Sequence, residues 1–249
     1  MNRFEPAGEM LSSPSIESAV PPTLRARTLA RIRFRGHEVT PHATFAPIHY
    51  EPGYAYPLIV WLHGPNGDER QLRRVMPLVS LRNYVAIAPR GTSADRAARN
   101  GFSWQQTTDD IDDAESRVFA CVETAQRRFH IHPDRVFLAG IGCGGTMALR
   151  IGGNHPAAFA GVASFGGRMP TEHRPLRHVN ALRQLPCLVA TGRESRDYPE
   201  PDVCRDLCLL HAAGCTVALR QYPGGDELTT TMLADLDRWI MGIVCPSPA

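Results

Sequence analysis

The chain has 249 residues, of which 43% are hydrophobic, so it is long enough to bury the core of one ordinary α/β domain. Lysine and arginine number 27 against 25 aspartates and glutamates, and the resulting net charge of +2 argues against a protein that binds nucleic acid through a basic surface. Five arginines between residues 25 and 35 form only a short run, in which we expect a solvated edge strand.

The cysteines and the first residues indicate the compartment. Seven cysteines are an odd number in a chain too large to need disulfides, which favours a reducing environment. Residues 1–22 contain no apolar segment of the signal-peptide type, and no stretch approaches the roughly 18 apolar residues of a membrane span. We therefore expect a cytoplasmic protein without a membrane span. Cys204 and Cys208, four residues apart on a predicted helix, are expected to pack in the core rather than bind zinc.

Strand and helix signals alternate along the chain. Apolar or alternating runs predict strands at residues 29–35, 44–50, 57–63, 84–89, 136–140, 161–165, 187–191 and 216–222. Amphipathic patterns predict helices at residues 69–81, 108–130 with Thr108 as the cap, from 146 onward, 200–213 and 227–241. Polar loops are expected at residues 90–103 and 166–179.

This alternation predicts a mostly parallel sheet covered by helices on both faces. The strands at 57–63 and 84–89 are continuously apolar, as strands buried on both faces are. One domain accounts for residues 23–245, and residues 1–22, rich in serine, proline and glutamate, are expected to form a disordered tail.

The segment V-F-L-A-G-I-G-C-G-G-T-M-A-L, residues 136–149, predicts a strand, a sharp turn and a helix. In a nucleophile elbow the turn reads G-x-S-x-G. Here Gly140 and Gly144 bracket Gly142 in the central position. Glycine has no side chain with which to attack a carbonyl.

Several segments together carry a family resemblance. They are V-W-L-H-G-P-N-G-D-E (60–69), A-P-R-G (88–91), G-F-S-W (101–104), the turn segment above, F-A-G-V-A-S-F-G-G (159–167) and Q-Y-P-G-G-D-E-L (221–228). In this order the chain from Thr44 to Ile240 resembles the phospholipase/carboxylesterase and acyl-protein thioesterase branch of the α/β-hydrolase superfamily. The resemblance implies a single-domain α/β-hydrolase fold.

The resemblance also assigns the three positions of a catalytic triad. It places Gly142 on the nucleophile, Ser195 in T-G-R-E-S-R-D-Y-P (191–199) on the acid, and Asp226 in Y-P-G-G-D-E-L on the histidine base. A triad works because an imidazole removes the proton of the nucleophile and a carboxylate stabilises the imidazolium. These three residues offer no such relay. The more ordinary interpretations are that Asp226 caps the following helix and that Ser195 is a loop hydroxyl.

The oxyanion-hole region implied by the resemblance contains His63, Gly64, Pro65 and Cys143. One donor should be the backbone N–H after His-Gly, but that residue is Pro65, which has none. The other donor, the N–H of Cys143, is retained. Asn66 could supply a replacement.

The sequence leaves two alternative catalytic arrangements to consider, a cysteine nucleophile and a metal site. Cys143 lies at a helix N-terminus, where thiolate is favoured, and His173 or His178 could serve as its base with Asp226 or Asp197 orienting the ring. A metal bound by His63, Asp226, Cys143 and His173 lacks any ligand-spacing motif, so we expect no metal and no cofactor. Trp104 either lines the substrate pocket that the resemblance implies or packs beneath the 90–103 loop.

Three hypotheses for function follow. The first is a non-catalytic relative, a pseudoenzyme, that binds a small acyl ligand or a protein partner through the residual pocket. The alternative is a weak or altered ester or thioester hydrolase that uses Cys143. The third is a structural role, since relatives of this branch often form homodimers.

Overall fold

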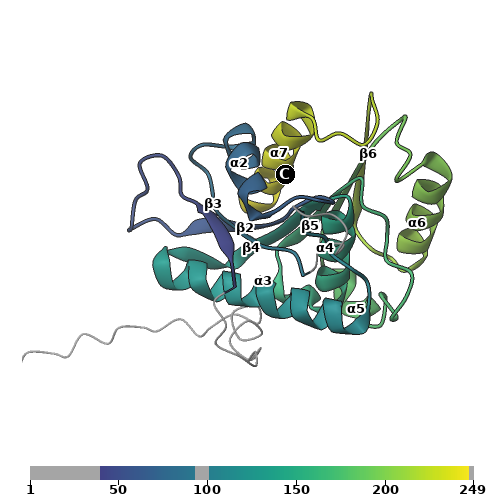
Figure 1. Cartoon of the computed structure of the whole chain (residues 1–249), viewed down its shortest axis with the longest axis horizontal. Helices are drawn as coiled ribbons and strands as arrows, with labels where there is room; N and C mark the ends of the chain where they lie inside the picture. The colour runs from purple at the N-terminus through teal and green to yellow at the C-terminus, as the bar shows by residue number, and fades with distance from the viewer. Residues whose placement is uncertain (1–39, 93–100, 247–249) are drawn as a thin grey trace, which may run out of the picture.

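The computed structural model describes residues 40–92 and 101–246, which form a seven-stranded sheet with helices on both faces (Figure 1). The order across the sheet is β1-β3-β2-β4-β5-β6-β7, with β1 antiparallel to β3 and the other neighbours parallel. The strands are β1 (His42–Phe45), β2 (Tyr56–Leu62), β3 (Val85–Pro89), β4 (Ile131–Ile141), β5 (Gly161–Phe165), β6 (Cys187–Gly192) and β7 (Val217–Tyr222). The predicted α/β class with a mostly parallel sheet is confirmed.

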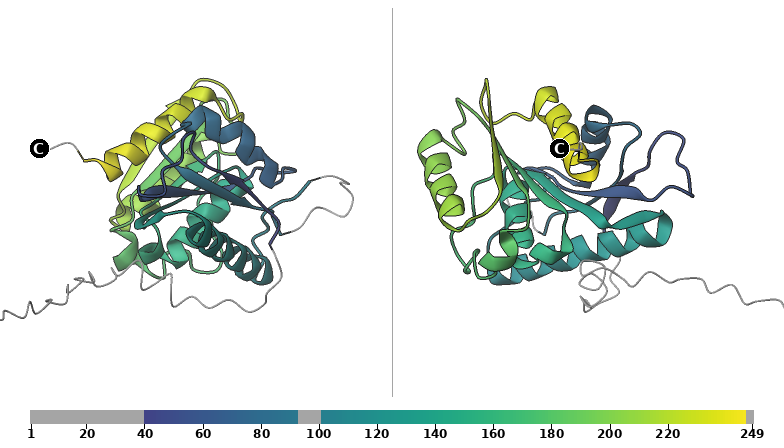
Figure 2. Two further views of the ribbon diagram at one scale, coloured as in Figure 1. Left: turned by 90° about the vertical axis from the view of Figure 1, so that its left-hand side faces the viewer. Right: turned by 180° about the vertical axis from the view of Figure 1, so that it is seen from behind.

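Helices α2 and α7 lie side by side over one face of the sheet, and α3 and α4 cover the other (Figures 1 and 2). The helical segments are η1 (Glu69–Gln71), α2 (Leu72–Val79), α3 (Thr108–Arg128), α4 (Cys143–Asn154), η2 (Pro156–Ala158), α5 (Val179–Leu182), α6 (Glu200–Ala212) and α7 (Thr230–Val244).

The continuous apolar run of β2 is explained by its place in the middle of the sheet. Leu58, Val60 and Leu62 join the core beneath α3 and α4, whereas Ile59 and Trp61 join the core beneath α2 and α7. Because successive side chains of a strand point to opposite faces, both faces need apolar residues.

Some predicted boundaries in the first half of the chain are wrong. The strand expected at 44–50 is β1, His42–Phe45. The elbow strand β4 begins at Ile131, five residues early, because Ile131 already pairs with Tyr56, and an irregularity in register absorbs the Pro133 segment before Val136. The cap of α3 is Thr107, whose hydroxyl accepts from the N–H of Asp110, and not Thr108.

Two further expectations fail in the second half. Helix α7 starts at Thr230, and Thr229 caps it by accepting from the N–H of Met232, so Asp226 is not its cap. Cys204 and Cys208 on α6 are exposed, because the face of α6 that turns inward carries Val203 and Leu210 instead. The expectation that this cysteine pair packs in the core is therefore wrong.

The predicted tail 1–22, the strand 29–35 and part of the loop 90–103 lie outside the described residues, so the limits of the domain stay a prediction. In the described part of the chain, no helix has the length and apolar character needed to cross a bilayer.

Candidate functional site

The turn between β4 and α4 has the backbone shape predicted from the glycine pattern. Gly142 adopts φ 54° and ψ −123°, in the positive-φ region, and its N–H donates to the carbonyl of Phe165 at 2.8 Å. Helix α4 begins at the next residue. A Cβ at Gly142 would lie 3.1 Å from Cδ of Pro65, so the apex faces the His63–Pro65 segment. The strand, sharp turn and helix therefore meet as in a nucleophile elbow, with no side chain at the apex.

Cys143 is the first residue of α4 and is half-buried. Its Sγ accepts from the hydroxyl of Ser103 at 3.5 Å. The first-turn N–H groups of a helix have no acceptor within the helix, so the N–H of Cys143 has no intrahelical partner. Pro65, the other residue that the family resemblance places in the oxyanion-hole region, is exposed and offers no N–H. Its neighbour Asn66, also exposed, has a positive φ of 55°.

His63 is fully buried and both of its ring nitrogens are engaged. Nδ1 lies 2.8 Å from the carbonyl of Gly64, and Nε2 lies 2.9 Å from the N–H of Gly91. An N–H can only donate, so Nε2 is the acceptor and Nδ1 carries the proton. Burial lowers the pKa of His63, which keeps this neutral form. The imidazole thus braces the turn and has no nitrogen free to act as a base.

Trp104 belongs to the same buried group. Its Nε1 donates to the backbone carbonyl of His63 at 3.1 Å, and its ring centre lies 5.3 Å from that of His63. These contacts place Trp104 against the His63 turn, a position that neither of the two sequence interpretations named.

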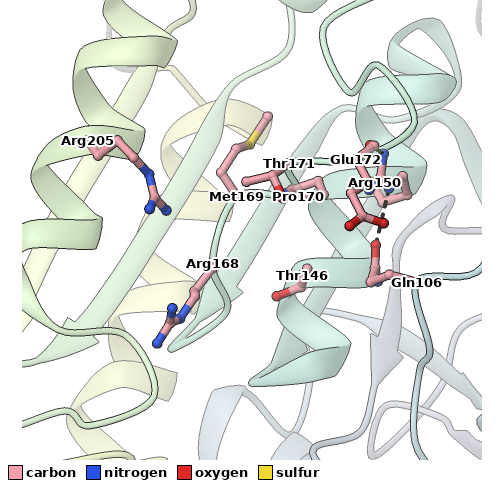
Figure 3. A pocket seen from close by; sticks show the side chains of 9 residues that line it. All are labelled: Gln106, Thr146, Arg150, Arg168, Met169, Pro170, Thr171, Glu172 and Arg205. Atoms are coloured by element: carbon pink, nitrogen blue, oxygen red, sulfur yellow. Dashed lines mark hydrogen bonds between the residues drawn. The ribbon is translucent and has the colours of Figure 1, made fainter.

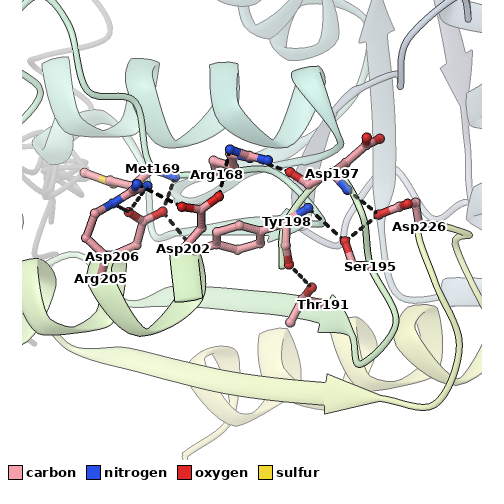
Figure 4. Close-up of polar contacts among 10 residues, drawn as sticks. All are labelled: Arg168, Met169, Thr191, Ser195, Asp197, Tyr198, Asp202, Arg205, Asp206 and Asp226. Atoms are coloured by element: carbon pink, nitrogen blue, oxygen red, sulfur yellow. Dashed lines mark hydrogen bonds and ion pairs between the residues drawn. The ribbon is translucent and has the colours of Figure 1, made fainter. Parts of the chain in front are cut away.

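Ser195 and Asp226, 31 residues apart, contact each other at the ends of β6 and β7 (Figure 4). The hydroxyl of Ser195 donates to one carboxylate oxygen of Asp226. The backbone N–H groups of Arg196 and Asp197 also donate to this carboxylate, each at 3.2 Å. The hydrogen bond from Ser195 is the main reason why the pKa of Asp226 is lowered. The ionised carboxylate thus holds the 195–197 turn in place by accepting these three hydrogen bonds.

His173 and His178 lie in the segment after β5. His173 is exposed with a positive φ of 57°, and its Nε2 is 3.9 Å from a carboxylate oxygen of Glu172. His178, also exposed, accepts at Nε2 from Nε of Arg177 at 2.8 Å. Within residues 40–92 and 101–246, neither ring is hydrogen-bonded to Cys143. The same residues hold no group of three or more histidine, cysteine or acidic side chains placed to bind a metal ion.

Two cavities near the turn differ widely in volume. Next to Asp226, Phe165 and Ile141 the free volume is about 10 Å³, which is room for about one water molecule. A larger cavity of about 460 Å³ opens next to the second turn of α4, where Thr146 and Arg150 form part of its wall (Figure 3). We call this cavity the Arg150 pocket. The Arg150 pocket is therefore large enough for a small molecule, whereas the space next to Asp226 is not.

Comparison with known proteins agrees with this geometry. The family model described as phospholipase/carboxylesterase matches residues 48–240. The chain belongs to the phospholipase/carboxylesterase family. A curated relative, the putative esterase NocK of Nocardia uniformis subsp. tsuyamanensis, is 30% identical over 139 residues, which are 55% of this chain and 39% of that protein. The match thus spans about two fifths of the length of NocK.

Several solved structures share the fold. The carboxylesterase of Bacillus cereus superposes with a TM-score of 0.66 at 14% identity, covering 83% of this chain and 96% of that one. The carboxylesterase of Mesorhizobium loti gives 0.63 at 20% identity, covering 75% and 88%. SOBER1 of Arabidopsis thaliana gives 0.63 at 20% identity, covering 76% and 100%. At these identities the likeness establishes the α/β-hydrolase fold alone.

The sequence analysis missed the residues that shape the larger cavity. Arg150 is 1% exposed, a charged side chain within the otherwise apolar and glycine-rich stretch M-A-L-R-I-G-G of α4. A charge at that place in a buried helix is a signal that the sequence does contain. The neighbours of Arg150, Gln106 and the backbone of Glu172, give no such signal, because they come from distant segments.

Proposed function

We propose that this member of the family is a non-catalytic relative that binds a small acyl ligand through the pocket left beside the elbow turn. The observation that carries the proposal is the apex of that turn, where Gly142 holds the elbow conformation without a side chain. Assignment of Gly142, Ser195 and Asp226 to the triad positions is part of the proposal, supported by the contact between Ser195 and Asp226.

The residues near Gly142 also support the loss of a working catalytic triad. His63 uses both ring nitrogens within its own turn, and Asp226 is held by Ser195 and two backbone N–H groups. Pro65 removes one oxyanion donor, a change that by itself typically slows acyl transfer about 10²- to 10³-fold. A glycine, a serine and an aspartate cannot replace nucleophile, acid and base.

Fluorophosphonate probes, which need an activated serine, are expected not to label this protein. Labelling is measured by intact mass after incubation, with a serine carboxylesterase of the family as the positive control. A mass shift that maps to any serine would contradict the disabled triad, because it would reveal a base that activates that serine.

A second candidate function is an altered ester or thioester hydrolase that uses Cys143. The observation in its favour is the hydroxyl of Ser103, which donates to Sγ of Cys143 at the start of helix α4. Against it, no imidazole of the described residues is hydrogen-bonded to the thiol, so the histidine pairing with His173 or His178 requires a rearrangement.

The two candidates differ in the hydrolysis of a short-chain aryl ester and a thioester. We expect wild-type protein and Cys143→Ala to show the same background rates, because no base is hydrogen-bonded to the thiol in the described residues. Turnover by wild type that disappears in Cys143→Ala would establish the thiol mechanism and refute the non-catalytic proposal.

Lesser proposals concern the protein as a whole. A reducing, cytoplasmic location is supported by its seven cysteines, all of which are free. A domain at residues 23–245 with a tail at 1–22, a protein partner in place of a small ligand, and a homodimer remain proposals that sedimentation and limited proteolysis test directly.

A further inference from the structure

The wall of the Arg150 pocket combines charged and apolar groups from four segments far apart in sequence (Figure 3). Arg150 and Thr146 come from α4, Met169 and Pro170 follow β5, Arg205 comes from α6, and Gln106 lies just before α3. Met169 and Pro170 are buried. A volume of about 460 Å³ lies within the range of about 300–1,000 Å³ typical of small-molecule sites.

Arg150 is a buried cation without an acidic partner. Its Nε donates to Oε1 of Gln106 at 3.2 Å, and its Nη1 donates to the backbone carbonyl of Glu172. Among residues 40–92 and 101–246, no carboxylate lies within ion-pair distance of it. Burial lowers the pKa of Arg150, as expected for a guanidinium removed from water, and the more distant charges of Glu172 and Glu115 only partly oppose this shift.

The other arginines of the pocket are already neutralised (Figure 4). Arg168 pairs with Asp202 at 2.7 Å, and Arg205 pairs with Asp202 and Asp206, each at 2.9 Å. In the described part of the chain, the positive charge that lacks an ion pair in this cavity therefore belongs to Arg150.

A second donor at the same wall lacks a partner. Nε2 of Gln106 is buried and has no acceptor among the residues that the structure describes. Oε1 of the same amide accepts from Arg150, so the NH₂ group cannot be exchanged for the oxygen without losing that bond. A buried donor without an acceptor costs about 1–3 kcal/mol in general, and an oxygen of a ligand would satisfy it.

We propose that the Arg150 pocket binds the carboxylate of a small monocarboxylic acid whose short apolar body packs on Met169 and Pro170. The proposal rests on the proposed ligand-binding function and names the class of ligand. The planar fork of a guanidinium matches the two oxygens of a carboxylate, and the free amide N–H of Gln106 adds a third hydrogen bond. Arg150, the arginine of the described pocket wall that lacks an ion pair, fits a single negative charge, which favours a carboxylate over a doubly charged phosphate.

The negative charge of Glu172 repels an anionic ligand in this pocket. Its side chain lines the pocket, is 77% exposed, and is one of two acidic groups whose charge raises the pKa of Arg150. Since an exposed side chain can move aside at little cost, the ligand is expected to displace it and to bind more tightly when its charge is removed.

The test is calorimetric titration of the full chain with sodium hexanoate, with hexanamide as the neutral match and inorganic phosphate as the second anion, at constant ionic strength. We expect hexanoate to bind at least tenfold more tightly than hexanamide and more tightly than phosphate. Arg150→Gln is expected to weaken hexanoate at least tenfold, with Arg127→Gln on the exposed end of α3 as the charge-matched control.

Because Arg150 is buried, its replacement could prevent folding, and Glu172→Gln provides an independent variant. It is expected to tighten hexanoate binding at least threefold, whereas Glu123→Gln, also exposed, leaves it unchanged. Equal affinity for hexanamide, tighter binding of phosphate, no binding of hexanoate, or no effect of Glu172→Gln would each overturn the proposal. Hydrolysis of a hexanoate ester by the same samples would refute the non-catalytic function and leave the carboxylate site standing, so the two failures are distinguishable.

Discussion

Gly144→Ala is expected to destabilise the fold by about 3 kcal/mol or more, because a Cβ at this position has no room. It would lie 2.4 Å from the backbone oxygens of both Leu62 and His63. These atoms belong to the end of β2 and to the buried histidine turn, so neither can move without disturbing the central strand. The close approach of α4 to β2 thus depends on glycine at this position.

The free energy of unfolding measured by urea denaturation checks this expectation. Gly242→Ala in α7 is the matched control, since nothing lies within 4 Å of its Cβ position. That exposed replacement is expected to stabilise the helix by about 0.5–1 kcal/mol. A Gly144→Ala protein as stable as wild type would mean that α4 does not pack on β2 as described.

Asp206→Ala is expected to cost about 3 kcal/mol, because it removes a buried acceptor from two donors. Oδ2 of Asp206 accepts from the N–H of Met169 at 2.9 Å and from the hydroxyl of Tyr198 at 3.0 Å (Figure 4). Asp206 itself is 2% exposed. Both donors would be left buried without a partner, and the segment that carries Met169 would keep, among the described residues, only the ion pair of Arg168 with Asp202 as a polar contact to α6.

Arg205→Ala is the matched control for this second prediction. It removes the ion pairs with Asp202 and Asp206 but leaves both buried donors paired, so a loss smaller than that of Asp206→Ala is expected. Asp206→Asn keeps an oxygen for the two donors and should fall between the two. Equal losses from Asp206→Ala and Arg205→Ala, measured by chemical denaturation, would show that the ion pair and not the buried acceptor stabilises this corner.

The sequence predicts the sheet well because its signals there are local. The run at 57–63 has no polar residue before His63, and such a run has few alternatives to a strand buried on both faces. The elbow turn is also local, since Gly140, Gly142 and Gly144 lie within five residues. Strand boundaries that depend on pairing with a distant strand, such as the early start of β4 opposite Tyr56, cannot be predicted from the local sequence pattern.

The candidate site is less accessible to sequence reasoning, because it depends on contacts between distant residues. Nothing local to Ser195 indicates that its hydroxyl meets Asp226, and nothing local to Gln106 indicates that it meets Arg150. The role of His63 is a similar case. A histidine before glycine at a strand end could serve chemistry or structure, and only the positions of Gly64 and Gly91 show that both nitrogens are occupied.

The glycine at the apex of the elbow also bears on stability. A residue with a Cβ held in such a turn stores about 1–3 kcal/mol of backbone strain, which an active hydrolase tolerates because the strain exposes its nucleophile. At φ 54° and ψ −123°, Gly142 adopts the same bend without a Cβ to clash. The bend at residue 142 therefore costs the folded state little strain, and a residue with a Cβ at this position would lower the free energy of unfolding by about 1–3 kcal/mol.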